Sequence, residues 1–201
     1  MEYSTTFAAG TLLHDEASRI IAAAEREGTL SDVDPSVLDI NSKSGRERRF
    51  REVERRLENI DQNIWSDFQQ RSQAEQQVVL YYACMKTYAL VADIHMNAVL
   101  PAWRSITQEL HRADIQRFLD EQVTAHPEID EWSESTHDKV QQVVRKMLRQ
   151  VGLLDGDRLQ RLQLPRSFWV RFVRAGDVWF LEAMFLSEEE RAQVVDLVRT
   201  T

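Results

Sequence analysis

The 201-residue sequence is poor in the residues on which disulfide-bonded, metal-binding and phosphate-binding proteins depend: it has one cysteine, four prolines and six glycines. The single cysteine, Cys84, excludes an intramolecular disulfide, and we expect a buried thiol in a cytoplasmic protein. No G-x-x-x-x-G-K phosphate loop occurs. The five histidines form no i, i+4 pair and lie beside no cysteine cluster, so we expect neither a metal site nor a cofactor.

Long uncharged apolar runs are scarce as well. The most apolar stretch, 78–100, contains Lys86, Asp93 and His95, which favours a buried helix, ended by Pro101, over a membrane span. The N-terminus lacks the basic region and apolar run of a secretory signal. No nucleophile with a base, and no set of separated carboxylates with a lysine, stands out. We therefore predict a cytoplasmic binding protein, not an enzyme, with no membrane or small-molecule partner.

Positive charge is in the minority overall but concentrated locally. The chain has 25 lysines and arginines against 33 acidic residues, a net charge of −8. The segment 139–174 nevertheless carries nine positive residues and two acidic ones, a net +7 that leaves −15 for the remainder. Such segregation creates a local potential that attracts a polyanion even though the average charge repels one. This segment is therefore the first candidate for a binding surface.

The stretch 132–164 has the pattern of a helix followed by a hairpin. Ser133 or Ser135 is suited to begin the helix, because a serine side chain accepts hydrogen bonds from the amides of the first turn. The predicted apolar face of the helix consists of Val140, Val143, Val144, Met147, Leu148 and Val151. Gly152 ends the helix, and Asp155-Gly156 predicts a tight turn between two short strands. This order is typical of a winged helix.

A second basic helix is predicted upstream, where the segment 43–56 carries seven positive and three acidic residues. Its predicted core stripe consists of Phe50, Val53, Leu57, Ile60 and Ile64. Arg48, Arg51 and Arg55 project from the opposite side. Three i, i+4 ion pairs are also possible on this helix: Glu47 with Arg51, Arg48 with Glu52, and Glu52 with Arg56. A binding face and an ordinary solvated face are therefore equal alternatives here.

The rest of the chain also favours helices. Apolar stripes predict further helices over 12–28, 103–110 and 115–123. The aromatic run 168–185 is expected to pack around a small sheet, with base stacking as the less favoured alternative. Ser187 and Glu190 form a capping box that predicts a final helix.

The predicted fold is therefore mainly α. We expect a helical bundle with an N-terminal helix-turn-helix-like unit and a C-terminal winged-helix-like unit that carries a small β-hairpin. The predicted regions are 1–68 for the N-terminal unit, 69–111 for a central helical layer, and 112–201 for the winged-helix-like part. These regions are expected to form one compact body.

These patterns predict a protein that binds duplex DNA. The leading turns of the capped helix would read base edges, and the following turns and the hairpin would hold phosphates. The predicted DNA-binding residues are Ser135, Thr136, Lys139 and Gln142 for base edges, Arg145, Lys146, Arg149, Arg158 and Arg161 for phosphates, and Arg48, Arg51 and Arg55 on the upstream helix. Two alternatives stay open: an adaptor whose basic surface docks an acidic partner protein, and an RNA-binding protein that uses the upstream helix.

Several short motifs, most of them between Trp132 and Leu154, are similar to those of a known family. The motifs are Tyr3-Ser4, Gly10-Thr11-Leu12-Leu13 with Glu16, Arg55-Arg56-Leu57, Glu131-Trp132-Ser133-Glu134-Ser135-Thr136 with Lys139, Met147-Leu148, and Gly152-Leu153-Leu154. In these the sequence resembles the BrxA family of BREX phage-defence systems. The resemblance implies a mainly helical, non-enzymatic component of a multi-protein defence locus, with other BREX proteins as partners. It also implies DNA binding through helix-turn-helix-like or winged-helix-like elements.

Overall fold

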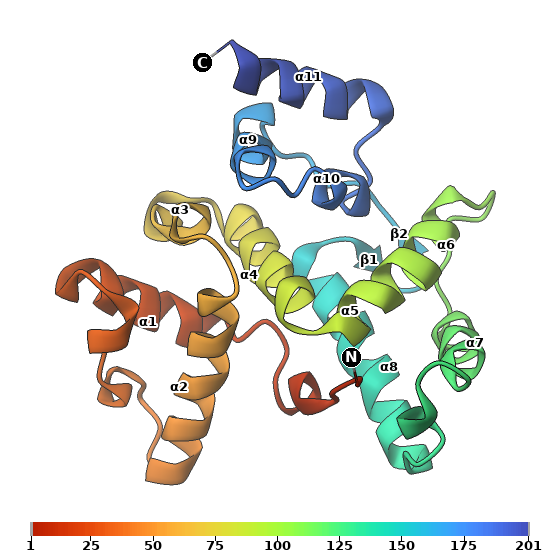
Figure 1. Cartoon of the computed structure of the whole chain (residues 1–201), viewed down its shortest axis with the longest axis horizontal. Coiled ribbons are helices and arrows are strands. Elements are labelled where there is room, and N and C mark those ends of the chain that lie inside the picture. Colours follow the sequence, from red (N-terminus) through yellow and green to blue (C-terminus); the bar gives the residue numbers. More distant parts are fainter. Residues whose placement is uncertain (1, 201) are drawn as a thin grey trace. The chain divides into compact units, whose positions relative to one another are not determined.

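The computed structural model describes residues 2–200, which are mainly helical with one short antiparallel hairpin, as the sequence predicts (Figure 1). Contacts divide the chain into two units. The N-terminal unit is Leu12–Thr87, and the C-terminal unit combines the segment ending at Thr11 with the chain from Tyr88 onward. The division into regions 1–68, 69–111 and 112–201 stays a prediction.

The N-terminal unit consists of helices and short 3-10 turns. Its elements are α1 (His14–Glu27), η2 (Leu30–Asp32), η3 (Pro35–Val37), α2 (Lys43–Glu58), α3 (Gln62–Trp65), η4 (Phe68–Gln70) and α4 (Gln73–Thr87). Ser42 begins α2, because its side chain accepts a hydrogen bond from the Gly45 amide at 3.3 Å. The predicted stripe of α2 is buried at Phe50, Val53 and Leu57, where the helix packs against α1 and α4.

The C-terminal unit contains the other helices and the hairpin. Its elements are η1 (Thr6–Ala9), α5 (Ala89–Ile94), the π turn η5 (His95–Val99), α6 (Leu100–Arg104), α7 (Arg112–Gln122), η6 (Pro127–Ile129), α8 (Glu134–Val151), β1 (Leu154–Asp155), β2 (Arg158–Leu159), α9 (Arg166–Arg174), α10 (Trp179–Ala183) and α11 (Glu188–Arg199).

The long apolar stretch is not the single helix that its sequence predicts. The chain is extended at Tyr88, which separates α4 from α5. Pro101 does not end the helix but lies in the first turn of α6, directly after the π turn. Proline is tolerated there because its missing N–H is not needed in the first turn and its ring fixes a helical φ. The helix predicted over 103–110 is likewise wrong beyond Arg104, since α6 ends there and residues 108–110 form backbone hydrogen bonds and a bridge with the hairpin.

Helix α8 follows the sequence prediction closely. Ser133 is its N-cap, with its side chain accepting from the Thr136 amide at 3.2 Å, and Gly152 ends it at φ 87°. The whole predicted apolar face is buried, and full burial of each such side chain contributes about 1.5–3 kcal/mol. The hairpin turn lies one residue later than predicted, because Leu154 pairs with Leu159 and Asp155 with Arg158.

The aromatic run forms helices, and its buried rings pack in the core, as the favoured alternative predicts. Phe168 and Phe172 lie on α9 and Phe180 on α10, and all three are buried with ring contacts that join the two helices. Helix α11 packs on α9 and begins with the predicted capping box, in which the Glu190 carboxylate accepts from the Ser187 amide at 2.7 Å. Packing, not a strand, therefore accounts for these aromatic residues.

The segment before Thr11 is fixed to the C-terminal unit by Tyr3. The Tyr3 ring stacks on His126 at 3.7 Å, and its hydroxyl donates to Asp93 at 2.7 Å. The Tyr3 amide donates to the Glu128 carboxylate at 2.6 Å. These contacts hold the connection between α7 and α8, which the His126–Glu128 segment forms.

His95 is buried in the π turn, and its Nε2 donates to the Ala183 carbonyl at 2.7 Å. Burial lowers the pKa of His95 to about 4. The unfolded chain therefore binds more protons than the native chain between about pH 4 and pH 6.5, and stability falls as the pH falls through this window.

We expect the free energy of unfolding to decrease by about 2–3 kcal/mol from pH 7 to pH 4.5 through His95 alone, because each pKa unit corresponds to about 1.4 kcal/mol. Urea denaturation of the wild type and of His95→Gln at both pH values measures this contribution. Glutamine retains a donor for Ala183 but does not titrate. An equal pH dependence in the two proteins would contradict the assignment.

Candidate nucleic-acid interface

The outer face of α8 carries a continuous polar stripe. Exposed side chains recur along it at alternating four- and three-residue steps: Ser135, Lys139, Gln142, Lys146 and Arg149. The three cations of this stripe have neither an ion pair nor a hydrogen bond within residues 2–200. They are therefore available to an anionic ligand without first losing an internal partner.

Hydroxyl groups gather at the beginning of α8. The Ser133 Oγ lies 2.8 Å from the Ser135 Oγ and 2.9 Å from the Thr136 Oγ1. Ser135 is exposed and continues the stripe, whereas Thr136 is half-buried. The exposed Asp138 is the acidic member of this turn. The leading turns thus combine hydrogen-bonding groups with one carboxylate.

Arg145 does not belong to the exposed face, although the sequence assigned it to phosphates. Its side chain is 5% exposed, and its guanidinium donates to the Leu110 carbonyl, to the Gly156 carbonyl at 3.0 Å, and to the Asp157 carboxylate. The hydrogen bond from Arg145 holds the pKa of Asp157 below its usual range. Arg145 therefore joins α8 to the hairpin turn, and a phosphate has no access to it.

The short segment 108–110 pairs with the hairpin, and the sequence analysis did not predict this pairing. The Leu110 amide donates to the Asp157 carbonyl, and the Leu159 amide donates to the Gln108 carbonyl, both at 2.8 Å. Glu109 and Arg158 form the antiparallel bridge between these bonds. One extended residue pair is too short to produce an alternating pattern, so the sequence carried no signal for it.

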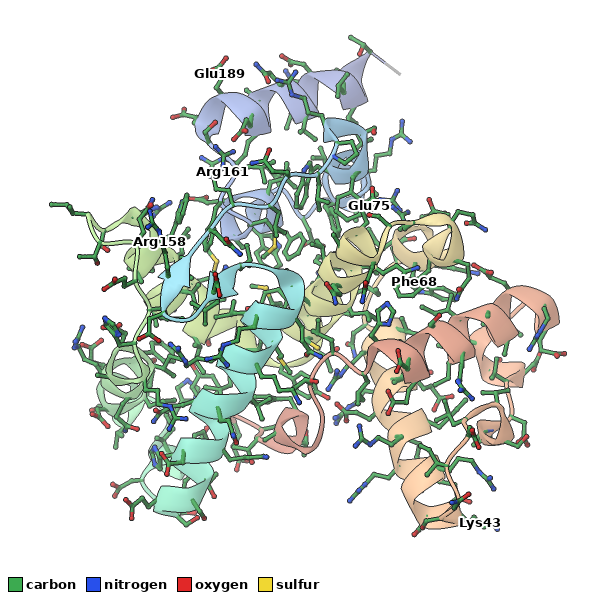
Figure 2. The ribbon with its side chains drawn as sticks, turned by 180° about the vertical axis from the view of Figure 1, so that it is seen from behind. Lys43, Phe68, Glu75, Arg158, Arg161 and Glu189 are labelled. Carbon is green, nitrogen blue, oxygen red and sulfur yellow. The ribbon has the colours of Figure 1, made fainter. Side chains whose placement is uncertain are left out.

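The two hairpin-side arginines differ in availability. Arg158 lies on β2, is exposed, and has no ion pair in the described part of the chain (Figure 2). Arg161 follows the hairpin, and its guanidinium donates to both carboxylate oxygens of Glu190 at the start of α11. This contact lowers the pKa of Glu190 to about 2. Arg161 is therefore partly neutralised by its own chain.

The predicted arginines of α2 are mostly paired. The Arg51 Nη2 lies 3.7 Å from the Glu47 carboxylate. The Arg55 Nη2 lies 2.6 Å from the Glu52 carboxylate, which also lies 2.7 Å from the Nη2 of the buried Arg56. The predicted pair of Arg48 with Glu52 does not form, and Arg48 is exposed with no acidic partner in residues 2–200. Helix α2 lies in the N-terminal unit, whereas the α8 stripe lies in the C-terminal unit.

Arg112 is exposed beside the hairpin and was not among the predicted residues. It is the first residue of α7, next to His111, whose Nδ1 lies 3.2 Å from the Asp157 carboxylate in the hairpin turn. No acidic group of the described chain pairs with Arg112. The capping box of His111 and Asp114 would have located this helix start in the sequence.

Within residues 2–200, no group of three or more histidine, cysteine, aspartate and glutamate side chains is arranged to hold a metal ion. No helix in that range is both long enough and apolar enough to cross a membrane.

Fold and site together define a mainly helical protein in which a basic helix stripe is followed by an antiparallel hairpin. A sequence model of the BrxA family matches residues 1–167, and the chain belongs to that family. The resemblance inferred from the short motifs is thereby confirmed. Helices α10 and α11 lie beyond the matched segment.

A curated relative and a solved structure are similar to this chain. The "BREX protein BrxA" of Escherichia coli O9:H4 (strain HS) is 26% identical over 128 residues, which are 64% of this chain and 60% of the relative. The chain thus spans about three fifths of that relative's length. The crystal structure of an uncharacterized protein from Magnetospirillum magneticum matches with a TM-score of 0.77 at 18% identity, covering 92% of this chain and 98% of the other. This second similarity concerns the fold alone.

We expect Arg145→Ala to lower the free energy of unfolding by about 1.5–3 kcal/mol, because it leaves two carbonyls and a carboxylate without their charged donor. The matched control is Arg149→Ala on the same helix, where an exposed side chain without partners predicts a change within about 0.5 kcal/mol. Urea denaturation measures both. Equal stability of the two variants would refute the assigned role of Arg145.

Proposed function

We propose that this chain is the duplex-DNA-binding component of a BREX-type phage-defence system and performs no catalytic step itself. The observation that carries the proposal is that the exposed Lys139, Lys146 and Arg149 on α8 have no ion pair or hydrogen bond among residues 2–200, in a protein that is acidic overall. Membership of the BrxA family and the similarity to a relative named as a BREX protein support the defence role.

The order of elements around the stripe supports a winged-helix mode of binding. Helix α6 is followed by the segment 108–110, then by α7, α8 and the β1–β2 hairpin. In winged helices and related helix-turn-helix proteins, the second helix of the pair enters the major groove with its N-terminal residues against the bases. In this proposal α8 has the role of that second helix, and the β1–β2 hairpin has the role of the wing.

The roles of individual residues follow from their chemistry and exposure. Ser135, Lys139 and Gln142 on the leading turns offer groups that form hydrogen bonds with base edges. Thr136 is half-buried and contributes at the margin of this face. The exposed cations further along, which are Lys146, Arg149, Arg158 and Arg112, are suited to phosphates. Arg145 is left out of the interface because it is buried.

The two alternative functions differ in their support: RNA binding by α2 has weaker support in the structure, and protein docking on α8 has the same support as DNA binding. RNA binding by α2 would depend on Arg48, since Arg51 and Arg55 are held in ion pairs. Docking of an acidic protein on the α8 stripe would use the same free cations as DNA. Titration with labelled duplex DNA, single-stranded DNA and duplex RNA separates the three. A preference for duplex RNA favours the first alternative, and the absence of any nucleic-acid binding at low salt favours the second.

The decisive variant combines Lys139→Ala, Lys146→Ala and Arg149→Ala. We expect weaker binding to every duplex sequence and a flatter salt dependence, with the slope of log K against log salt reduced by about 0.9 per lost phosphate contact. Fluorescence anisotropy at several salt concentrations measures both quantities.

The matched control removes three exposed cations elsewhere, by Arg19→Ala, Arg26→Ala and Lys86→Ala in the N-terminal unit. It changes the net charge equally but leaves α8 intact. If both triple variants lose the same affinity, the effect is one of overall charge and the α8 stripe is not the interface.

We further expect Glu190→Gln to tighten duplex-DNA binding about three- to tenfold, because Arg161 loses its carboxylate partner and becomes free for a phosphate. Glutamine retains the capping box with Ser187, so α11 is expected to stay folded. Glu189→Gln is the matched control, since Glu189 lies in the same turn without contacting Arg161. An equal effect of the two substitutions would exclude Arg161 from the interface.

A further inference from the structure

Tyr3 holds the turn that precedes α8 through three separate contacts within the C-terminal unit. Its ring stacks on His126, with the ring centroids 3.7 Å apart and the planes inclined by 12°. Its amide donates to the Glu128 carboxylate at 2.6 Å, and its hydroxyl donates to Asp93 of α5 at 2.7 Å. Tyr3 therefore joins η6 to α5, although Glu128 lies 125 positions away along the chain.

The ionisation of the groups around Tyr3 favours these hydrogen bonds. Burial, together with the bond to Asp93, raises the pKa of the Tyr3 hydroxyl, so the hydroxyl remains a donor. The hydrogen bond from the Tyr3 amide lowers the pKa of Glu128, so its carboxylate remains a charged acceptor. The contacts of Tyr3 are therefore present at neutral pH.

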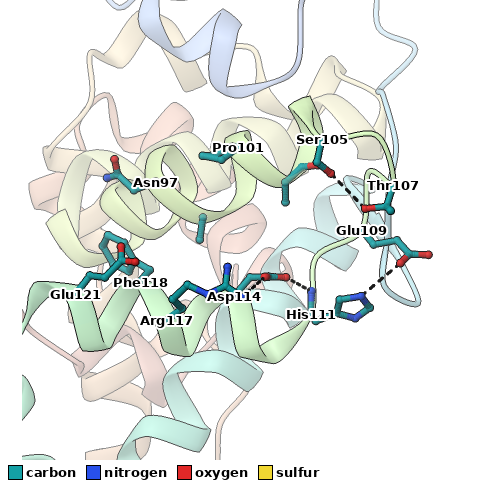
Figure 3. Close-up of a pocket in the computed structure, with 12 residues that line it drawn as sticks. Asn97, Pro101, Ser105, Thr107, Glu109, His111, Asp114, Arg117, Phe118 and Glu121 are labelled. Atoms are coloured by element: carbon teal, nitrogen blue, oxygen red, sulfur yellow. Dashed lines mark hydrogen bonds and ion pairs between the residues drawn. The ribbon is translucent and has the colours of Figure 1, made fainter.

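The two ends of α7 are fixed by different contacts. At its beginning, the His111 amide donates to the Asp114 carboxylate in the capping box (Figure 3). At its end, the His126 amide donates to the Gln122 carbonyl at 2.8 Å, and the chain continues directly into η6. The connection from α7 to α8 thus begins at the residue on which the Tyr3 ring stacks.

The position of η6 is passed on to α8 through the Ile129 carbonyl. The His137 Nε2, near the beginning of α8, donates to this carbonyl at 3.2 Å, and the Trp132 amide donates to it at 3.1 Å. The rings of Trp132 and His137 lie 5.6 Å apart. Ser135 and Lys139 lie two positions before and after His137. The placement of η6 therefore sets the direction in which the leading turns of α8 point.

The chain before α1 contacts α8 directly as well. The turn η1, drawn in red beside α8 in Figure 1, packs against that helix. Phe7 in this turn is fully buried, and its ring centroid lies 5.6 Å from that of Tyr88. The segment 3–9 is thus an integral part of the C-terminal unit, although α1–α4 separate it from α5 in the sequence.

We propose that Tyr3 is a positioning residue for DNA binding, which fixes η6 and thereby orients the leading turns of α8 toward the base edges. The inference rests on the proposed function, because it concerns the orientation of that same α8 surface. Tyr3 is 6% exposed and acts through η6 without touching DNA. Its loss lowers the fraction of molecules in which α8 is correctly placed, and the apparent affinity decreases by that fraction.

The test compares two substitutions in the full chain. Tyr3→Leu removes the stack on His126 and the hydroxyl but keeps an apolar side chain, whereas Tyr3→Phe removes only the hydroxyl. We expect fluorescence anisotropy to show duplex-DNA binding about fivefold weaker in Tyr3→Leu and within about twofold of wild type in Tyr3→Phe. The slope of log K against log salt is expected to stay unchanged, because no phosphate contact is lost.

The matched control is Val194→Ala, which removes buried apolar volume from α11. We expect this variant to be less stable than wild type but to bind DNA equally well. If Val194→Ala and Tyr3→Leu weaken binding equally at a temperature at which both are folded, the effect of Tyr3 is one of stability and the proposal is overturned.

A double-mutant cycle separates the orientation of α8 from general packing. Tyr3→Leu is combined with either of two backgrounds, which are the leading-turn variant (Ser135→Ala, Lys139→Ala and Gln142→Ala) and the following-turn variant (Lys146→Ala and Arg149→Ala). We expect Tyr3→Leu to weaken binding less than about twofold in the leading-turn variant and about fivefold in the following-turn variant. An equal effect in the two backgrounds would contradict the proposal.

Amide hydrogen exchange without DNA gives a readout that does not depend on the ligand. We expect Tyr3→Leu to raise the exchange rates across 126–137 about tenfold and to leave those of α9 and α10 unchanged. Unchanged exchange across 126–137 refutes the role of Tyr3. Absence of DNA binding by the wild type at low salt refutes the proposed function, and with it this inference. Wild-type DNA binding that Tyr3→Leu leaves intact refutes the role of Tyr3 alone.

Discussion

The buried guanidinium of Arg145 is the interaction on which the arrangement of the candidate interface depends. One side chain from the middle of α8 donates to the segment 108–110 at Leu110, to the hairpin turn at Gly156, and to the carboxylate of Asp157. The hairpin itself has only two residue pairs, and a ribbon of that length is not stable alone. Arg145 supplies a rigid attachment to a long helix, and burial strengthens its hydrogen bonds while making their loss costly. Arg145 thus fixes the exposed cations of α8 relative to Arg158 on the hairpin.

Positive and negative side chains are concentrated on different surfaces of this protein. For ligand binding, this distribution matters more than the net charge. The net charge of −8 opposes a polyanion, yet the α8 stripe consists of cations with no internal partner among residues 2–200. Some other positive groups are neutralised locally, as Arg161 is by Glu190 and Arg55 is by Glu52. The carboxylates of Glu109, Asp114 and Glu121, which line a pocket beside α7, have the opposite charge. Because screening limits electrostatic effects to about 10 Å at ordinary salt, neighbouring faces of one small protein can attract ligands of opposite charge.

The sequence predicted much of the fold correctly where local signals were strong. The predictions were wrong where tertiary contacts overrode those signals. The start of α8 at Ser133 or Ser135, its buried valine face and its end at Gly152 were predicted, because each depends on residues within one helix, and the cap is Ser133. Pro101 was predicted to end a helix, but the preceding π turn places it where proline is tolerated. The aromatic run 168–185 had no clear period, since it is divided between the short helices α9 and α10 and the turns beside them. No pattern marked the segment 108–110, whose conformation is set by its bonds to the hairpin.

The sequence by itself determined the helices, their caps, the hairpin, the concentration of positive charge and the family, because each of these is a property of neighbouring residues or of spacing along one element. Tertiary structure alone decided which cations are available. Arg145 and Lys146 are adjacent in sequence and equally basic, but the 100° rotation per helical residue directs one into the protein and the other into solvent. Arg161 meets Glu190 across 29 positions, a pairing that no local pattern encodes. Exposure and long-range pairing depend on where distant segments pack, and for this reason they could be known only from the folded chain.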